Sequence, residues 1–166
     1  MDFFDVVEKR ASVRSFTKCE ISEETLERIL EAGRKAPSGR NTQPWEFILI
    51  RDPETLRKLG KIQGCIADAS AAIAVVMNEA ASQYWKEDAS AAIENMLLAI
   101  VALGYGALWV EGYVLMNEEY GKEVLGVPEN LRLLAVLPIG KPANPPVQAS
   151  KKPLKEILHR ERYGQR

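Results

Sequence analysis

Ala36–Trp45 reads APSGRNTQPW and separates a pattern typical of an amphipathic helix from a pattern typical of a strand. Pro37 ends the helix, and Gly39 permits a backbone angle that other residues avoid. The loop also carries short polar side chains that donate and accept hydrogen bonds, at Ser38, Asn41 and Gln43. Beside the flat ring of Trp45, they suit a planar ligand with polar edges. The alternative is that they only satisfy the backbone of a turn and that Trp45 packs in the core.

A second candidate stretch, Arg10–Phe16, reads RASVRSF and follows a short amphipathic N-terminal segment. If the stretch is extended, alternation sends Arg10, Ser12 and Arg14 to one side. Two guanidinium groups and a hydroxyl on one side form a receptor for a phosphate or another oxyanion. The alternatives are that the arginines form a solvated face or that they pair with acidic neighbours.

Together these stretches resemble the nitroreductase family of FMN-dependent oxidoreductases. In that family a helix ends in an Arg-x-Ser-x-Arg/Lys run, and the next helix ends in Pro-Ser-x-x-Asn-x-Gln-Pro-Trp. The resemblance extends to the alanine-rich helix around Asn95 and to Gly104–Gly112. It implies an α+β fold with a central, mainly antiparallel sheet flanked by helices, in an intertwined homodimer. It also implies that FMN passes hydride from NADH or NADPH, through its N5 atom, to a nitroaromatic, a quinone or a similar small-molecule acceptor, in a ping-pong sequence.

The resemblance assigns the residues that would hold FMN. They are Arg10, Ala11 and Ser12 near the phosphate and ribityl chain, Arg14 at the N1/O2 edge of the ring, Pro37, Ser38, Gly39 and Asn41 from the other subunit, Val110, Glu111 and Gly112 beside N5, and Lys151 and Lys152 on the phosphate.

The backbone N-H of Glu111 is the expected donor to N5. No side chain is expected to act as an acid or base, because flavin and solvent supply the protons. A cation at the N1 edge favours the anionic reduced ring and so raises its reduction potential. Without the resemblance, the favoured interpretation of the 110–112 segment is a simple strand end and turn, and that of the two lysines is a solvated pair.

Two departures from the family pattern leave other functions open. The Asn and Lys that the family often places at the pyrimidine edge have no secure match, with only Lys61 and Gln63 nearby, and the interval from Asn78 to Glu87 leaves little room for lid helices. The alternative function is a flavin-binding carrier, sensor or interaction module without reductase turnover. A third hypothesis is a phosphate-binding scaffold that uses Arg10 and Arg14 without flavin.

Composition indicates one domain over residues 1–166, with 143–166 as an extended C-terminal tail and helix. The apolar fraction of 46% and the charged fraction of 27% are ordinary for a globular chain. A net charge of -1 indicates neither nucleic acid nor membrane as a partner.

The inventory of reactive side chains is small. Cys19 and Cys65 are too few and too far apart for a metal knuckle or a CxxC pair, and His159 is the only histidine. These counts predict no metal site and favour an organic cofactor. The start of the chain, with Asp2 and Asp5, does not resemble a signal peptide, and no apolar run is long enough to span a bilayer, so the expected location is the cytoplasm.

Periodicity predicts helices over residues 2–10, 22–36, 54–61, 87–103, 117–125 and 153–162, and strands over 46–51, 71–77, 107–110 and 131–137. The apolar run Ala71–Met77 is typical of a central strand covered on both sides. The helix over 87–103 is apolar nearly all round, so a second subunit is a plausible cover, and its Asp88 and Asn95 are expected to be satisfied interface groups. The prolines at 138, 142, 145 and 146 predict an irregular tail that does not pack within the core.

Overall fold

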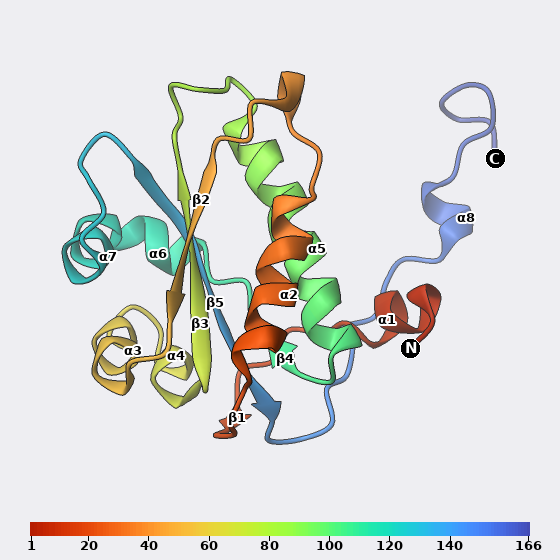
Figure 1. Ribbon diagram of the computed structural model, residues 1–166. Coiled ribbons are helices and arrows are strands. Elements are labelled where there is room, and N and C mark those ends of the chain that lie inside the picture. Colours follow the sequence, from red (N-terminus) through yellow and green to blue (C-terminus); the bar gives the residue numbers. More distant parts are fainter.

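The computed structural model describes residues 1–166 and contains one sheet of five antiparallel strands. The strand order is β1 (Phe16–Thr17), β5 (Arg132–Pro142), β3 (Ala71–Met77) and β2 (Trp45–Ile50), with β4 (Gly106–Ala107) also paired to β5. One face is covered by α2 (Glu23–Arg34) and α5 (Trp85–Ala102), and the other by α3 (Pro53–Leu59), α4 (Cys65–Asp68), α6 (Gly112–Met116) and α7 (Glu118–Leu125) (Figure 1). The predicted α+β arrangement, an antiparallel sheet between helices, is confirmed.

The central strand β3 is buried along its whole length because helices cover both faces of the sheet. Alternate side chains, from Ala71 to Met77, join the core under α2 and α5. The side chains between them, Ala72, Ala74 and Val76, join the core under α3 and α6. Strand side chains alternate between faces, so a strand with both faces covered must be apolar throughout. The prediction for this run is confirmed.

Helices α2 and α5 cross closely because small and polar groups meet at their contact. A Cβ on Gly33 would lie 2.8 Å from Cγ of Met96, so only glycine lets the two backbones approach this far. The Asn95 side chain donates a hydrogen bond of 3.1 Å to the Ala32 carbonyl, which satisfies Asn95 within its own chain. On the side away from α2 and the sheet, Leu98 and Val101 remain only partly buried.

Strand β5 extends through the prolines that were expected to end it. It runs to Pro142, and Pro138 and Gly140 are buried within it. The N-H and C=O of one residue point to the same side of an antiparallel strand, and the Pro138 carbonyl accepts from Leu108 N-H at 3.4 Å. Pro138 therefore faces the irregular 108–110 segment, and its missing N-H removes no bond to β3. The predicted irregular tail begins only after Pro142.

Other elements also differ from the prediction, and the short elements β1, α4 and α6 were not predicted at all. The strand over 107–110 is only the two-residue β4, after which Val110 makes a single bridge to Val136 and the chain turns into α6. Helix α6 was not predicted, because five residues are too few for periodicity to detect. The last helix, α8 (Leu154–Ile157), has four residues instead of ten, because nothing packs against it and short helices need such packing.

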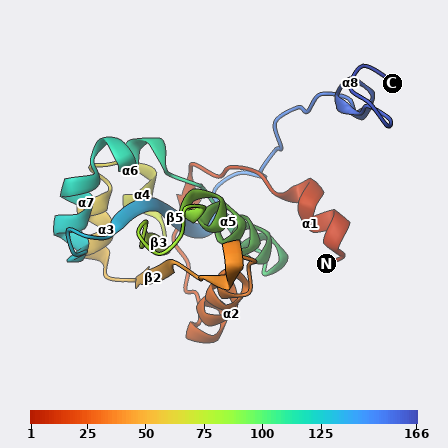
Figure 2. The ribbon, with the colours of Figure 1, turned by 90° about the horizontal axis from the view of Figure 1, so that it is seen from above.

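The two chain ends project together from the sheet and its helices. Helix α1 (Phe3–Lys9) and the tail from residue 143 leave on the α5 side, and α8 lies farthest out (Figure 2). Their apolar side chains are exposed, with Phe4 75%, Leu154 68% and Ile157 59% accessible. No helix of the chain has both the length and the apolar character needed to cross a bilayer.

Candidate functional site

The stretch after α1 is extended and alternates as predicted. Ala11 and Val13 are buried, whereas Ser12 and Arg14 are exposed. The Val13 N-H donates to the Ala107 carbonyl at 2.9 Å, and Ser12 bridges Ala107. This contact needs Gly106, because a Cβ there would lie 2.6 Å from Cγ2 of Val13. The hydroxyl of Ser12 and the guanidinium of Arg14 are thus directed to one side by a fixed backbone.

The two arginines of this stretch differ in their partners. Arg14 makes no ion pair, whereas Nε of Arg10 lies 3.7 Å from Oε1 of Glu94 on α5. The ion-pair alternative therefore holds for Arg10, whereas the exposed, unpaired Arg14 fits both a solvated face and a ligand site. A hollow of about 290 Å³ lies beside Ser12 and Arg14, closed by residues 144–147 of the tail.

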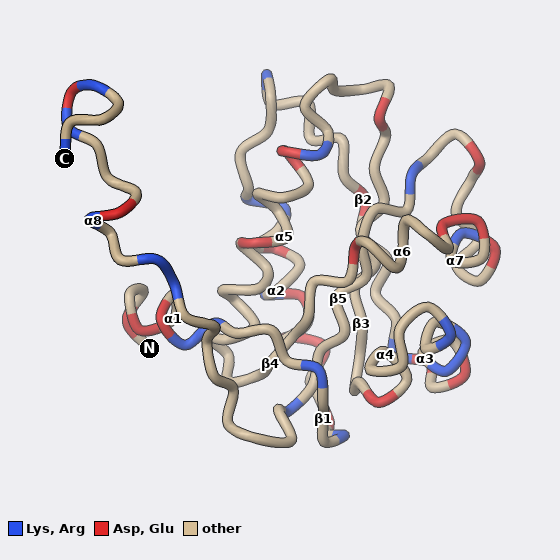
Figure 3. The backbone as a smooth tube through the Cα atoms, turned by 180° about the vertical axis from the view of Figure 1, so that it is seen from behind, with Lys and Arg blue, Asp and Glu red and all other residues tan.

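A side chain that was not predicted ties the tail to this stretch. Nε2 of Gln148 donates to the carbonyls of Val7 and Arg10, at 3.0 and 2.8 Å. Lys151 and Lys152 follow three and four residues later, so the anchor keeps both near α1. Figure 3 shows basic stretches on the tail beside α1 and on the segment that leads from α1 to β1. The signal that could have drawn attention to Gln148 is an amide in a proline-rich segment, although Asn144 in the same segment has the same character.

The segment from Ala107 to Gly112 continues away from Ser12 along the edge of β5. Val110 exchanges hydrogen bonds of 3.1 and 2.9 Å with Val136, which fixes the backbone just before Glu111. The N-H of Glu111 makes no hydrogen bond to the protein, and Gly112 is exposed at the start of α6. The four residue steps from Ala107 to Glu111 span at most about 13 Å. Because Ser12 bridges Ala107, Glu111 and Ser12 lie in the same region of one chain.

Cys65 lies half-buried among the apolar residues behind this stretch. Burial raises the pKa of the Cys65 thiol, although the nearby Arg14 guanidinium acts in the opposite direction. A raised pKa keeps the sulfur protonated near neutral pH, and a thiol is a poor nucleophile. Cys65 is therefore a packing residue.

The loop at residues 37–43 has a backbone that few sequences adopt. Arg40, Asn41 and Gln43 have φ angles of 53°, 57° and 49°, in the left-handed region. Gly39 has no positive φ, so the role expected for it is wrong. It is needed for space instead, because a Cβ on Gly39 would lie 2.5 Å from Cδ2 of Tyr84.

The polar side chains of this loop divide between the two interpretations that the sequence left open. Oγ of Ser38 accepts from the N-H of Gln43 at 3.0 Å, which satisfies a turn. Trp45 is buried in the core, 8% exposed. The Asn41 side chain makes no hydrogen bond and is exposed, as is Pro37. Asn41 is therefore free for a ligand, as are the exposed side chains of Arg40 and Thr42, which make no hydrogen bond either.

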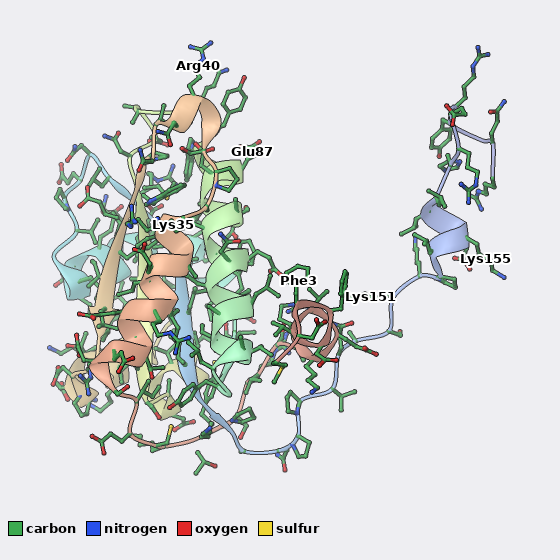
Figure 4. All side chains as sticks on the ribbon, turned by 45° about the vertical axis from the view of Figure 1, so that its right-hand side comes forward. Phe3, Lys35, Arg40, Glu87, Lys151 and Lys155 are labelled. Carbon is green, nitrogen blue, oxygen red and sulfur yellow. The ribbon has the colours of Figure 1, made fainter.

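The structure does not bring this loop to the Arg10–Arg14 stretch. The loop contacts Asp88 near the start of α5, whereas Ser12 and Val13 contact Ala107, beyond the end of the helix. The 14 residues from Asp88 to Ala102 correspond to about 21 Å of helix. Figure 4 shows Arg40 beyond one end of α5 and Lys151 far from it, beside α1. One chain thus carries two halves of a candidate site, and they face different regions.

Comparison with known proteins gives a consistent result. The family model described as the Nitroreductase family matches residues 7–87 and 63–141. A protein of Archaeoglobus fulgidus, provisionally named an NADH dehydrogenase/NAD(P)H nitroreductase, is 41% identical over 143 residues, 80% of this chain and 81% of the relative. A protein of Methanothermobacter thermautotrophicus with the same provisional name is 33% identical over 88% of this chain and 80% of its own.

Solved structures agree with these relatives. The crystal structure of a provisionally named NADH dehydrogenase/NAD(P)H nitroreductase of Bacteroides thetaiotaomicron has a TM-score of 0.89 and 33% identity, over 97% of this chain and 98% of that one. A provisionally named nitroreductase of Desulfovibrio desulfuricans, crystallised in complex with FMN, has a TM-score of 0.87 and 30% identity, over 98% of both chains.

Proposed function

The chain belongs to the nitroreductase family, and from that premise we propose that it is an FMN-dependent NAD(P)H oxidoreductase. The electron donor is NADH or NADPH, and the acceptor is a nitroaromatic, a quinone or a similar small molecule. The donor and acceptor bind in turn at one site, in a ping-pong sequence. The FMN in the similar structure from Desulfovibrio desulfuricans supports the choice of cofactor.

The residues of this chain fit FMN in charge and in hydrogen-bonding capacity. Arg14 is exposed and unpaired, Ser12 presents its hydroxyl on the same side, and the Glu111 N-H has no partner in the protein. The observation that carries the proposal is that these free donors lie on two adjoining segments held together by the contact between Val13 and Ala107. Bound FMN supplies the two-electron chemistry that no side chain here can supply.

Each donor has a distinct proposed role. Ser12 and Arg10, with Lys151 and Lys152 of the anchored tail, hold the phosphate. Arg14 places positive charge at the N1/O2 edge, where reduction adds negative charge. The Glu111 N-H donates to N5, and Ala11, Val110 and Gly112 line the cofactor with backbone.

We propose that the functional unit is a homodimer in which Pro37, Ser38, Gly39 and Asn41 of one chain complete the pocket of the other. Two observations support it. The loop is held at Asp88, whereas Ser12 and Val13 contact Ala107 beyond the end of α5, about 21 Å of helix away, and Arg10 pairs with Glu94, about 9 Å of helix away. The exposed apolar side chains of α1 and the tail also need a cover, which a second copy would provide.

Anaerobic titration tests the activity. The purified protein should be yellow, and NADH or NADPH should bleach the flavin absorbance, which returns when a quinone is added. A protein that stays colourless after FMN is added contradicts the proposal and favours the scaffold that binds phosphate without flavin.

Mixing two variants, at an FMN concentration too low to fill the altered sites, tests the shared site. If each site is built from both chains, a hybrid dimer of an Arg14→Ala chain and an Asn41→Ala chain has two different sites. One site carries both substitutions, and the other carries neither. Unfolding and refolding the two together should therefore restore activity to roughly a quarter of the wild-type value, because about half of the dimers are hybrids and each has one intact site. No restoration means that each site uses residues of a single chain.

A second candidate function is FMN binding without reductase turnover. The observation that favours it is the connection from Asn78 to Tyr84, which has only turns where lid helices would shape a substrate pocket. A yellow protein that neither NADH nor NADPH bleaches would support this carrier or sensor and contradict the reductase.

A further inference from the structure

Asp88 is a buried carboxylate that holds two separate segments. It lies in the first turn of α5 and is 4% exposed. Its Oδ1 accepts from the N-H of Gly39 at 2.7 Å, and its Oδ2 accepts from the hydroxyl of Ser82 at 2.8 Å. A carboxylate removed from water needs such donors, and bonds to a charged acceptor are about twice as strong as neutral ones.

The bond to Gly39 is the only hydrogen bond between residues 37–43 and the rest of the protein. The other hydrogen bonds of the loop are internal, such as Gln43 N-H to Ser38 Oγ and Gln43 Nε2 to the Asn41 carbonyl. The loop also contains three non-glycine residues in the left-handed region. Such a conformation persists only where the surroundings enforce it.

The segment behind the loop is itself anchored. The Asn78 N-H donates to the Pro44 carbonyl at 2.8 Å, and the Arg132 guanidinium donates to Glu79 at 3.0 Å. Ser82 then connects to Asp88, and the Tyr84 ring packs on Gly39. Asp88 thus joins a strained loop to a fixed support.

We propose that Asp88 is a positioning residue for FMN binding. Through the Gly39 N-H it holds the loop in the shape that presents Asn41 to the flavin of the other subunit. The inference rests on the proposed function, because it takes the loop to be part of a flavin pocket. Asp88 itself touches no cofactor.

Two substitutions and one control test this role. Asp88→Leu removes both acceptors and keeps the branched side chain with the same number of heavy atoms, whereas Asp88→Asn keeps one oxygen for Gly39 without the charge. Glu87→Gln is the matched control, because Glu87 is the preceding residue of α5, carries the same charge and is exposed (Figure 4). If Asp88→Leu does not fold, Asp88→Asn and Ser82→Ala, which removes only the second donor, still give the comparison.

The first readout is the FMN dissociation constant, measured by flavin fluorescence in dimers whose folding is verified by circular dichroism. Asp88→Leu should weaken binding about tenfold or more, Asp88→Asn less, and Glu87→Gln less than twofold. Equal affinity in the wild type and in folded Asp88→Leu overturns the proposal.

The second readout needs no flavin and separates the two proposals. Hydrogen exchange of the Gly39 amide, followed by NMR without FMN, should be slow in the wild type and in Glu87→Gln and much faster in Asp88→Leu. A wild-type protein that binds no FMN overturns the proposed function and the cofactor role of Asp88, while slow Gly39 exchange still supports its hold on the loop. Equally fast exchange in all three proteins overturns that hold even where FMN binds.

Discussion

Gly39 lies against Tyr84 so closely that a Cβ on Gly39 would come within 2.5 Å of Cδ2 of the ring, and within 3.4 Å of Cβ of Tyr84. The contact involves the inner atoms of the tyrosine, which cannot move without a change of rotamer. A glycine in the Pro-Ser-x-x-Asn loop is therefore fixed by packing, and the loop and the segment before α5 fit together as one unit.

Gly39→Ala should destabilise the protein by about 1–3 kcal/mol, the usual cost of overpacking. The double variant Gly39→Ala/Tyr84→Ala should recover part of this loss, because the clash disappears with the ring. Thermal or urea unfolding measures both effects. Gly64→Ala is the control, since a Cβ at Gly64 meets nothing within 4 Å and its φ of -50° suits alanine. A Gly39→Ala protein as stable as the wild type would refute the contact.

The sequence predicts the elements whose signals are local. Asp2, Ser22 and Asp52 each accept a backbone N-H at the start of a helix, and an N-cap needs only its own neighbours. The continuous apolar run of β3 needs only two covered faces. The alternation of Ser12 and Arg14 to one side likewise follows from the period of an extended chain.

What the sequence could not predict depends on contacts between distant segments. Pro138 fits inside β5 because it faces the irregular 108–110 segment and not β3, and the residues near Pro138 in sequence do not indicate that neighbour. Gly39 suggests a positive φ, but its reason for being glycine is Tyr84, 45 residues later. The hydrogen bond between Asp88 and the same loop joins residues 49 positions apart, and no local pattern in a single sequence predicts it.

The ion pair between Glu118 and Arg132 should make stability depend on acid pH. Arg132 donates two hydrogen bonds of 2.9 Å to the carboxylate, and Leu133 N-H donates a third of 3.0 Å. The guanidinium holds the pKa of Glu118 below its ordinary value of 4.5. A lowered folded-state pKa contributes stability that is complete above the unfolded-state pKa and is lost as the pH falls through the folded-state value.

Glu118→Gln should therefore lower the free energy of unfolding by about 1–3 kcal/mol at pH 7. The difference from the wild type should begin to shrink as the pH falls below about 4.5, where this carboxyl is protonated in the unfolded state, and should disappear below the lower folded-state pKa. Urea unfolding at several pH values measures it. Glu123→Gln, an exposed change on the same helix, should show little effect at any pH. A difference that does not vary with pH would mean that the charge of Glu118 is not what stabilises the fold.

Arg14→Ala should weaken FMN binding about tenfold or more, or lower the flavin potential. The substitution removes the unpaired guanidinium that we propose for the N1/O2 edge of the flavin. The melting temperature of the flavin-free protein should not change, since Arg14 is exposed and makes no ion pair. Fluorescence titration and potentiometry measure the two flavin properties. Arg28→Ala, another exposed arginine without an ion pair, should change neither. Unchanged flavin content and potential in Arg14→Ala would remove that residue from the site.

Gln148→Ala should release the tail from α1, because its side chain supplies two hydrogen bonds, to the Val7 and Arg10 carbonyls. Trypsin should then cleave after Lys151 several times faster than in the wild type, as the tail spends more time detached, whereas the bond between Lys152 and Pro153 resists trypsin in both proteins. FMN binding should weaken with it if those lysines hold the phosphate. Gln165→Ala is the control, because this residue lies farther along the tail and its side chain makes no hydrogen bond. It should change neither the cleavage rate nor the FMN affinity. Faster cleavage with full FMN affinity would confirm the anchor and exclude the two lysines from the phosphate site.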